Sequence, residues 1–216
     1  MEPKLDLKKY CTIYLVRHGQ TDWNLKKKMQ GHKDIPLNKN GIKQAQQAAK
    51  RLAKIKFDEA FSSDLSRAKQ TAEIIALEHK LTIQTSKALR ERSFGDFQGK
   101  TGVQYRQALK TTLDKYESLT DKEKLKFKMP YKIENWEKVM VRFISFLRKI
   151  AISYPQKTVL VASHGGLIRH FLIKLGFAEN NQLPWGSVEN LATIKLLSDG
   201  VDFFVKETWG VHKNES

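Results

Sequence analysis

Residues 10–19 read YCTIYLVRHG, and residues 158–166 read TVLVASHGG. Each stretch is an apolar, β-branched run of strand length that leads into a histidine followed by glycine. Runs that are apolar throughout, without alternation, are typical of parallel strands buried on both faces. Because parallel sheets place ligand sites at the carboxyl ends of their strands, we expect His18 and His164 to meet at one edge of a sheet.

The segments around these two strands alternate between helix and strand patterns. The predicted helices, each with one apolar face, span 38–53, 64–77, 134–153 and 167–175. The further strands span 57–61, 81–85, 191–197 and 201–205, the last two forming a hairpin. Asn38 is the expected N-cap of the first helix, whose predicted apolar face is Ile42, Ala45, Ala48, Ala49, Leu52 and Ala53. This alternation predicts an α/β fold with three layers (α/β/α) and a mostly parallel central sheet.

Residues 101–130 differ in composition from the rest of the chain. They are rich in Lys, Thr and Glu and contain no glycine after Gly102. We interpret them as one or two helices inserted over the sheet. A chain of 216 residues fits one sizeable domain, so we expect a single domain over 1–216 with a helical insertion at about 101–135.

The composition favours a folded protein of a reducing compartment. Hydrophobic residues make up 40% of the chain, enough to form a core. The single cysteine, Cys11, cannot form an internal disulfide. No apolar run approaches the roughly 18 residues of a membrane span, and the first ten residues lack the apolar stretch of a signal peptide. We therefore expect a cytoplasmic protein with no membrane partner; whether it is a monomer or a homodimer stays open.

The net charge of +16 suggests an anionic partner. The cations are mostly lysines scattered along the chain, and the residues 26–28 form the one run of three. Nucleic-acid readers cluster arginine and lysine on one stripe with aromatic residues between them, a pattern not found here. We interpret the lysines as a solvated surface that attracts small anions such as phosphate esters, and expect no nucleic-acid partner.

The loop after the first strand has the chemistry of an anion site. Arg17 precedes His18, Gly19 follows it, and Thr21 and Asn24 offer further hydrogen-bond donors. The rigid guanidinium fork matches phosphate oxygens, and each charge-assisted hydrogen bond contributes about 1.5–3 kcal/mol. Glycine lets the backbone approach a ligand closely.

Two other charged positions could serve the same site. Arg67 lies in the first turn of the helix over 64–77, where a cation opposes the helix dipole unless it serves an anion; the alternative is an ordinary surface arginine. Glu91 stands between Arg90 and Arg92, which would lower the pKa of its carboxyl if they paired with it. It is either part of a surface ion-pair network or a proton-transferring carboxylate beside the phosphate.

Five blocks in order carry a family resemblance. They are LVRHGQTDWN at 15–24, GHKDIPLNKNGIKQA at 31–45, SSDLSRAKQTAEII at 62–75, LRERSFGDFQGK at 89–100 and VASHGGLIR at 161–169. Together they resemble the histidine phosphatase superfamily in its phosphoglycerate-mutase-like branch. The resemblance implies a phosphoglycerate-mutase-like fold whose helical insertion lies over the active site.

The resemblance also implies roles for single residues. His18 would be the nucleophile that becomes phosphohistidine, and Glu91 would protonate the leaving oxygen and later activate water. The phosphoryl oxygens would be held by Arg17, Arg67 and a protonated His164, with Asn24 and the Gly165 N–H completing the pocket and Thr21, Gln30 and Gly31 also binding substrate. No cofactor and no metal is implied; the remaining histidines, His32, His79, His170 and His212, are expected to be structural or exposed.

Departures from the family pattern leave alternatives open. Gln98 stands where many relatives have glutamate, and 132–135 reads KIEN where many have Gly-Glu-Ser, although Glu134 and Arg142 keep the family spacing. Mutases of this branch usually carry adjacent arginines in the insertion, but here 101–130 contains Arg106 alone. We therefore expect a metal-independent phosphatase of small phosphomonoesters. The alternatives are a cofactor-dependent phosphoglycerate mutase, a fructose-bisphosphate-type phosphatase and a non-catalytic anion-binding relative.

Overall fold

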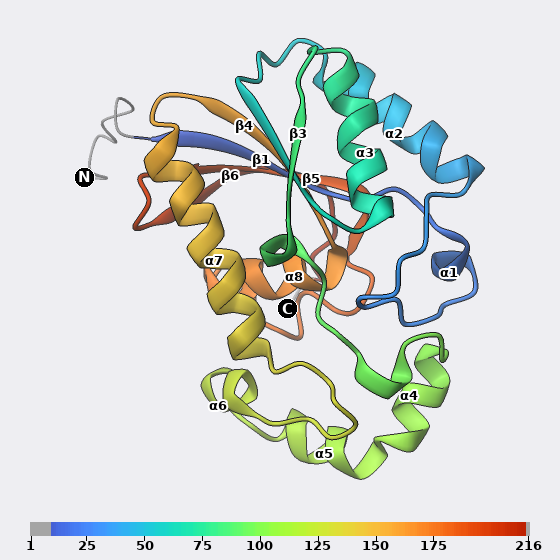
Figure 1. Ribbon diagram of the computed structural model, residues 1–216. Helices are drawn as coiled ribbons and strands as arrows, with labels where there is room; N and C mark the ends of the chain where they lie inside the picture. Colours follow the sequence, from blue (N-terminus) through green and yellow to red (C-terminus); the bar gives the residue numbers. More distant parts are fainter. Residues whose placement is uncertain (1–9, 215–216) are drawn as a thin grey trace.

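The computed structural model describes residues 10–214, which form a six-stranded sheet covered by helices on both faces (Figure 1). The strands lie in the order β3-β2-β4-β1-β5-β6. Their bounds are β1 Cys11–Arg17, β2 Glu59–Ser63, β3 Ile83–Ser86, β4 Thr158–Ser163, β5 Val188–Ser198 and β6 Phe203–Val211. The predicted three-layer α/β fold is confirmed.

The four strands β3, β2, β4 and β1 are parallel neighbours, whereas β5 is antiparallel to both β1 and β6. The sheet is therefore mostly parallel, with the predicted hairpin at its end. In the register of the central pair, Arg17 lies opposite Ser163. Because β1 and β4 end at the same level, the residues that follow them, His18 and His164, emerge side by side.

The helices run over α1 Asp22–Leu25, α2 Lys39–Leu52, α3 Ser66–Leu77, α4 Gly102–Ala108, α5 Lys110–Glu117, α6 Asp121–Lys126, α7 Trp136–Ser153 and α8 Gly165–Lys174. Two short 3₁₀ turns, η2 Lys87–Leu89 and η3 Gly95–Phe97, flank the segment that carries Glu91. The predicted N-cap is confirmed, since the Asn38 side chain accepts a hydrogen bond from the Gly41 N–H at 2.8 Å. None of the helices within 10–214 is long and apolar enough to cross a membrane.

Alternating side chains of β1 build two cores. Ile13 and Leu15 face α7 and α8, where they join a cluster with Phe143 and Phe171. Tyr14 and Val16 face the other way and pack with the α2 and α3 side chains Ala48, Ala49, Ile75 and Ala76. Figure 1 shows α2 and α3 on one side of the sheet and α7 and α8 on the other. Each large apolar side chain buried in this way contributes about 1.5–3 kcal/mol, so β1 and its partners form a rigid base for the loops at their ends.

Most predicted boundaries are wrong by one to three residues, and the last strand, predicted over 201–205, is instead β6 Phe203–Val211. Phe57 is buried against Tyr14, with ring centroids 5.4 Å apart, but it precedes β2 instead of opening it. The strand continues instead through Ser62 and Ser63, because parallel neighbours pair with both sides of it. On α2, Ile42 is 40% exposed and Ala53 is exposed, since both lie at the ends of the helix rather than on its buried stripe.

The insertion contains three helices, α4 to α6, and not one or two. Figure 1 shows them gathered below the sheet and beside the start of α7, so they do not lie across a face of the sheet as predicted. They pack on a small core of their own, made of Met29, Phe94, Phe97, Tyr105, Leu109, Met129 and Ile133. Tyr105 of α4 and Leu109 between α4 and α5 are buried in this cluster and not against the sheet.

Candidate active site

A cavity of about 430 Å³ opens at the carboxyl ends of β1 and β4. Its walls include Arg17 and His18 from the end of β1, Arg67 from the start of α3, Glu91 from the segment after β3, and Gly165 from the start of α8. The structure thus brings these predicted site residues to one place. The placement follows from the parallel register, because each of these residues stands at or just beyond the carboxyl end of a strand.

The His18 ring has a fixed tautomer. Its Nδ1 lies 2.7 Å from the backbone carbonyl oxygen of Gly19. A carbonyl oxygen can only accept a hydrogen bond, so Nδ1 carries the proton and Nε2 keeps its lone pair. Burial, followed by the charges of Arg67 and Arg17, lowers the pKa of His18 well below its usual range, against the opposite effect of the Gly19 hydrogen bond. His18 is therefore a neutral imidazole at neutral pH.

Three elements clamp the backbone on either side of His18. The His18 carbonyl accepts a hydrogen bond from Asn190 Nδ2 of β5 at 2.9 Å, and the Gly19 N–H donates to Thr71 Oγ1 of α3 at 3.0 Å. Gly19 also packs against the start of α2, where a Cβ would lie 2.6 Å from the Gly41 carbonyl oxygen. Any larger residue at position 19 would push this loop away from α2. Sequence reasoning missed Asn190 and Thr71, because their contacts are to backbone atoms of a distant segment.

Arg17 and Arg67 are held by backbone carbonyl groups and not by carboxylates. Arg17 Nη1 donates to Val188 O at 2.5 Å, and Arg67 donates to the carbonyls of Lys33 and Gly31 at 2.9 and 2.8 Å. Burial lowers the pKa of each to about 10, partly offset by the charge of Glu91, so both remain cations at neutral pH. Within the described chain the buried Nε atoms of both arginines have no hydrogen-bond partner, and such a donor costs about 1–3 kcal/mol. Two unsatisfied cationic donors at one cavity favour an anionic ligand.

His164 lies directly beside His18, with ring centroids 5.2 Å apart. It is completely buried, it is not part of the cavity wall, and neither ring nitrogen has a hydrogen-bond partner among residues 10–214. Burial, then the charge of Arg67 and the neighbouring His18, lowers its pKa well below the usual value. The charges of the protein itself therefore favour a neutral His164 ring, and the prediction that this ring is protonated is wrong. A phosphate dianion bound beside the ring would raise the pKa of His164.

The Glu91 carboxylate is held by two backbone N–H groups. Arg92 N donates to Oε1 and Gly166 N donates to Oε2, both at 2.9 Å. The two glycines at the start of α8 make this fit possible: a Cβ on Gly166 would lie 2.9 Å from Glu91 Oε2, and one on Gly165 would lie 2.8 Å from Arg17 Nε. Glu91 thereby lines the cavity with a fixed carboxylate, 8% exposed.

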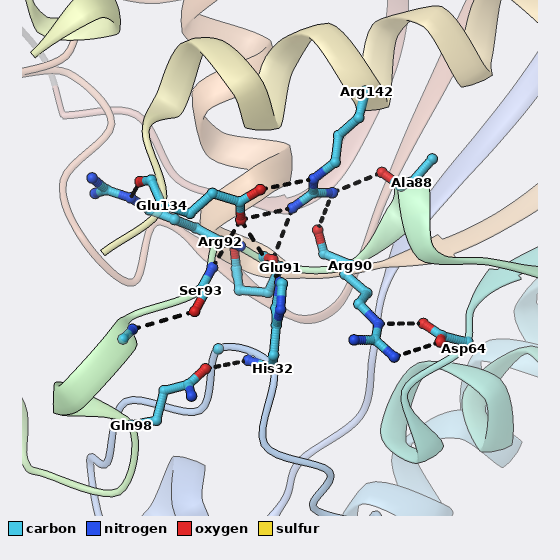
Figure 2. Close-up of polar contacts among 12 residues, drawn as sticks. His32, Asp64, Ala88, Arg90, Glu91, Arg92, Ser93, Gln98, Glu134 and Arg142 are labelled. Atoms are coloured by element: carbon cyan, nitrogen blue, oxygen red, sulfur yellow. Dashed lines mark hydrogen bonds and ion pairs between the residues drawn. The ribbon is translucent and has the colours of Figure 1, made fainter. Parts of the chain in front are cut away.

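The segment behind Glu91 is clamped by Arg142 of α7 (Figure 2). The Arg142 guanidinium donates to three backbone carbonyls, those of Ala88 at 2.8 Å, Arg90 at 2.7 Å and Glu91 at 3.0 Å. The Glu134 carboxylate pairs with Arg142 at 3.2 Å and accepts a hydrogen bond from Ser93 N at 3.0 Å. The spacing of Glu134 and Arg142 noted in the sequence therefore serves to fix the backbone around Glu91.

His32 completes this clamp from the opposite side. Its Nε2 lies 2.8 Å from the Glu91 carbonyl oxygen, and its backbone N–H donates to Gln98 Oε1 at 2.6 Å. Gln98, which departs from the family pattern, thus serves as an acceptor for a backbone group. The flanking arginine side chains do not pair with Glu91: Arg90 forms a two-point ion pair with Asp64, and Arg92 donates to the Glu134 carbonyl (Figure 2).

The remaining predicted binding residues divide into two groups. Asn24, Gln30 and Gly31 line the cavity as expected. Thr21 is completely buried and does not line it. It caps the short helix α1 instead: its Oγ1 accepts a hydrogen bond from Asn24 N at 3.2 Å, while its own N–H donates to Asn24 Oδ1 at 3.0 Å. Thr21 therefore positions Asn24.

The four other histidines have the expected structural or exposed character. His79 packs on Phe57 and His170 stacks on Trp136, with centroids 4.9 and 3.3 Å apart, and His212 is exposed. His32 is also structural, and its structural role is to support the segment that carries Glu91. In the part of the chain that the structure describes, no group of three or more His, Cys, Asp or Glu side chains could hold a metal ion.

Comparison with known proteins places this geometry in context. Residues 13–209 match the family model of the histidine phosphatase superfamily (branch 1). Phosphoglycerate mutase-like protein 4 of Arabidopsis thaliana is 39% identical over 162 residues, which cover 74% of this chain and 69% of that protein. The uncharacterized phosphatase PhoE of Bacillus subtilis (strain 168) is 34% identical over 167 residues, 76% of each chain. The solved structure of Bacillus stearothermophilus YhfR is similar with a TM-score of 0.78 and 28% identity, covering 90% of this chain and 95% of that one.

Proposed function

This chain belongs to the histidine phosphatase superfamily (branch 1), and from that premise we propose that it hydrolyses phosphomonoesters of small metabolites through a phosphohistidine on His18, without a metal ion. The observation that carries the proposal is the locked tautomer of His18. Its Nδ1 proton is engaged by the Gly19 carbonyl, so the lone pair of Nε2 is available at a cavity lined by two cations, Arg17 and Arg67. A neutral imidazole beside two guanidinium groups suits attack on a phosphoryl group.

In the first step, Nε2 of His18 forms a bond to phosphorus as the bond between phosphorus and the leaving oxygen breaks. The negative charge on the phosphoryl oxygens is balanced by Arg17 and Arg67, two cations that line the cavity. Glu91 serves as the general acid of this step: a proton on its carboxyl passes to the leaving oxygen, so that the product departs as a neutral alcohol.

In the second step, water replaces the leaving group in the cavity. Glu91, now a carboxylate, removes a proton from this water as the water oxygen attacks phosphorus. The bond between phosphorus and His18 Nε2 breaks, and inorganic phosphate leaves. The backbone N–H groups of Arg92 and Gly166, which hold the Glu91 oxygens, keep the carboxyl in one position for both transfers.

The test is hydrolysis of p-nitrophenyl phosphate in the presence of EDTA. We expect turnover by the wild type and none by His18→Ala, with His79→Ala as the matched control, since His79 is not part of the cavity wall. Rapid denaturing quench of the wild type should also trap a phosphorylated protein with the acid-labile, base-stable linkage of phosphohistidine. Hydrolysis by His18→Ala, or a trapped phosphate on another residue, would contradict the proposal.

The second candidate is a phosphoglycerate mutase, which the name of the Arabidopsis relative favours. Arg106, the one arginine of 101–130, is exposed on α4 and does not line the cavity. The insertion therefore offers no arginine to hold a second acidic group, which favours the phosphatase. Incubation with 3-phosphoglycerate separates the two functions: a phosphatase releases inorganic phosphate, whereas a mutase forms 2-phosphoglycerate.

We further propose that residues 1–216 form a single domain with its insertion at about 101–135, and that the protein acts in the cytoplasm as a monomer or homodimer. The single cysteine, Cys11, has no partner for an internal disulfide, which supports a reducing compartment. Sedimentation of the purified protein would determine the oligomeric state.

A further inference from the structure

The cavity is much larger than a phosphoryl group needs. Its volume is about 430 Å³. A phosphoryl group is roughly the size of two or three water molecules, each of which takes about 30 Å³ in the liquid, so it fills less than a quarter of this space. The remainder, here called the outer half, is lined by Trp23, Lys27, Lys28, Phe94, Arg169 and Trp185. Arg169 is engaged by Leu183 and Asn180, and the other residues are placed to bind the part of the substrate that leaves.

The charges of the cavity exceed what one phosphoryl group requires. Of the described side chains that line it, five are lysine or arginine and one, Glu91, is a carboxylate. Arg17 and Arg67 stand with Glu91 beside His18, which assigns them to the phosphoryl group. Lys27 and Lys28 belong to the outer half, where the described wall contributes no carboxylate. A second anionic group on the substrate would find these cations there.

The outer half also presents aromatic surface. Trp185 is 60% exposed although it lies at the cavity, and its ring is tilted against that of Phe94 with centroids 6.1 Å apart. Trp23, from the N-terminal part of the chain, also lines the cavity. Lys28 Nζ lies 5.6 Å from its ring centroid. Aromatic surface gathered at one cavity, here Trp185, Phe94 and Trp23, marks a ligand-binding groove.

Trp185 stands on a loop that is fixed in place. Arg169 of α8 donates to the backbone carbonyls of Leu183 and Asn180 and to the Asn180 side chain, the last at 2.7 Å. A turn follows in which Ser187 N donates to Pro184 O at 3.1 Å. The exposure of Trp185 is therefore built into the fold, and the indole is held where a substrate ring could pack on it.

On these grounds we propose that the outer half binds a leaving group that carries both a ring and a second anionic group, either carboxylate or phosphate. Trp185 packs on the flat face of the ring, and Lys27 and Lys28 attract the second anion. The proposal rests on the phosphatase function proposed above, and it narrows the substrate class of the same site.

Matched pairs of phosphomonoesters test the two halves of the proposal separately. The pair 3-phosphoglycerate and glycerol 3-phosphate differs by a carboxylate without a ring, and 4-carboxyphenyl phosphate and phenyl phosphate differ by a carboxylate on a ring. Fructose 1,6-bisphosphate and fructose 6-phosphate supply the same comparison with phosphate as the second anion. Because each variant is compared with the wild type on the same compound, differences in leaving-group reactivity cancel.

For the second anion, the variant is the double substitution Lys27→Gln and Lys28→Gln. We expect the ratio of kcat/KM for the carboxylated compound to that for its uncarboxylated partner to fall about tenfold in both pairs. The control is Lys43→Gln with Lys50→Gln on α2, which removes the same charge from exposed positions outside the cavity. A larger fall for the fructose pair than for the carboxylate pairs would identify phosphate as the second anion, and the reverse would identify carboxylate.

For the ring, the variant is Trp185→Ala, with Trp209→Ala on β6 as the matched control. We expect the ratio of kcat/KM for phenyl phosphate to that for glycerol 3-phosphate to fall about fivefold in Trp185→Ala alone. Equal losses on all compounds, or ratios no different from those of the two controls, would overturn the inference while leaving the phosphatase function intact. Failure of the wild type to hydrolyse any of the six compounds would overturn the proposed function and this inference together.

Discussion

The ends of β1 and β4 are alike in sequence and different in construction. Both strands run into a histidine followed by glycine, and both histidines have a pKa lowered by burial and by Arg67. His18, however, has its Nδ1 fixed by the Gly19 carbonyl and its own carbonyl held by Asn190, whereas the ring nitrogens of His164 have no partner in the described chain. A fixed ring suits a nucleophile, which must point one lone pair at phosphorus, and an unpaired ring suits a group that responds to the phosphoryl oxygens.

The carboxyl ends of β1 and β4 supply different parts of the site. The β1 end supplies the nucleophile and Arg17, and the β4 end supplies, through the Gly166 N–H, one of the two donors that hold the Glu91 carboxylate. The tight packing at Gly165 and Gly166 links the two ends, because Arg17 lies against one glycine and Glu91 against the other. The difference between two similar motifs therefore lies in which hydrogen bonds their surroundings provide.

Substitution of the two histidines is expected to separate them most strongly. His18→Ala should lose turnover by at least about 10⁴-fold and lose the trapped phosphoenzyme, since the covalent route is closed. His164→Ala should retain the phosphoenzyme and lose about 10²-fold in kcat, because it removes the ring that packs beside His18 but not the bond-forming atom. Rapid-quench detection of protein-bound phosphate in both variants measures this. A phosphoenzyme that survives in His18→Ala but not in His164→Ala would reverse the assignment.

Glu91→Gln probes the carboxylate that the β4 end holds. The amide fits the same space but cannot transfer a proton, so kcat for an alkyl phosphate should fall about 10²- to 10⁴-fold. The loss should be smaller for p-nitrophenyl phosphate, whose leaving oxygen needs no proton. Steady-state rates on the two substrates measure the difference, and Glu134→Gln, which changes a carboxylate of the supporting network, is the matched control. Equal losses on both substrates would assign Glu91 a structural role.

Much of this site can be predicted from the sequence, because local sequence patterns locate the positions of its residues. His18, His164, Arg67 and Glu91 all stand at strand ends or helix starts that the apolar patterns locate, and parallel strands bring such positions together. Asn190 and Thr71 are not predictable in this way, because each supports the site through a backbone atom of a distant segment, a contact that leaves no pattern near the residue itself. The surface that the insertion packs on could not be predicted for a related reason: its apolar residues indicate a buried face, but they do not say that Phe94 and Met29 provide the partner surface.

The lowered pKa values of the two histidines predict a pH dependence of stability. Below about pH 6.5 the unfolded chain binds protons at both rings, whereas the folded protein keeps them neutral. Unfolding therefore takes up protons, and the free energy of unfolding must fall as the pH falls, by up to about 1.4 kcal/mol per pH unit for each histidine. Urea unfolding at pH 6.5 and 5.5 should show a slope that decreases in His18→Gln and again in the double variant with His164→Gln. An unchanged slope would mean that both rings take up protons in the folded state.

The prediction with the smallest expected effect tests the difference between the ends of β1 and β4 most directly. Asn190→Ala removes the side-chain donor to the His18 carbonyl and makes the β1 end resemble the β4 end. Because Nδ1 remains bonded to Gly19, the tautomer is kept and the ring gains only some freedom, so kcat should fall about three- to tenfold with little change in KM.

The control for this loss is Asn40→Ala, an exposed asparagine at the start of α2 that bonds the Gln20 side chain. A structural role of Asn190 alone would lower the unfolding midpoint without changing the rate of the folded enzyme. A positioning role should slow formation of the phosphoenzyme in a single turnover, while its hydrolysis, which depends on Glu91 and water, changes less. An equal slowing of both steps would show that the clamp on His18 does not distinguish the two strand ends, and that the neutral, tautomer-locked ring is sufficient by itself.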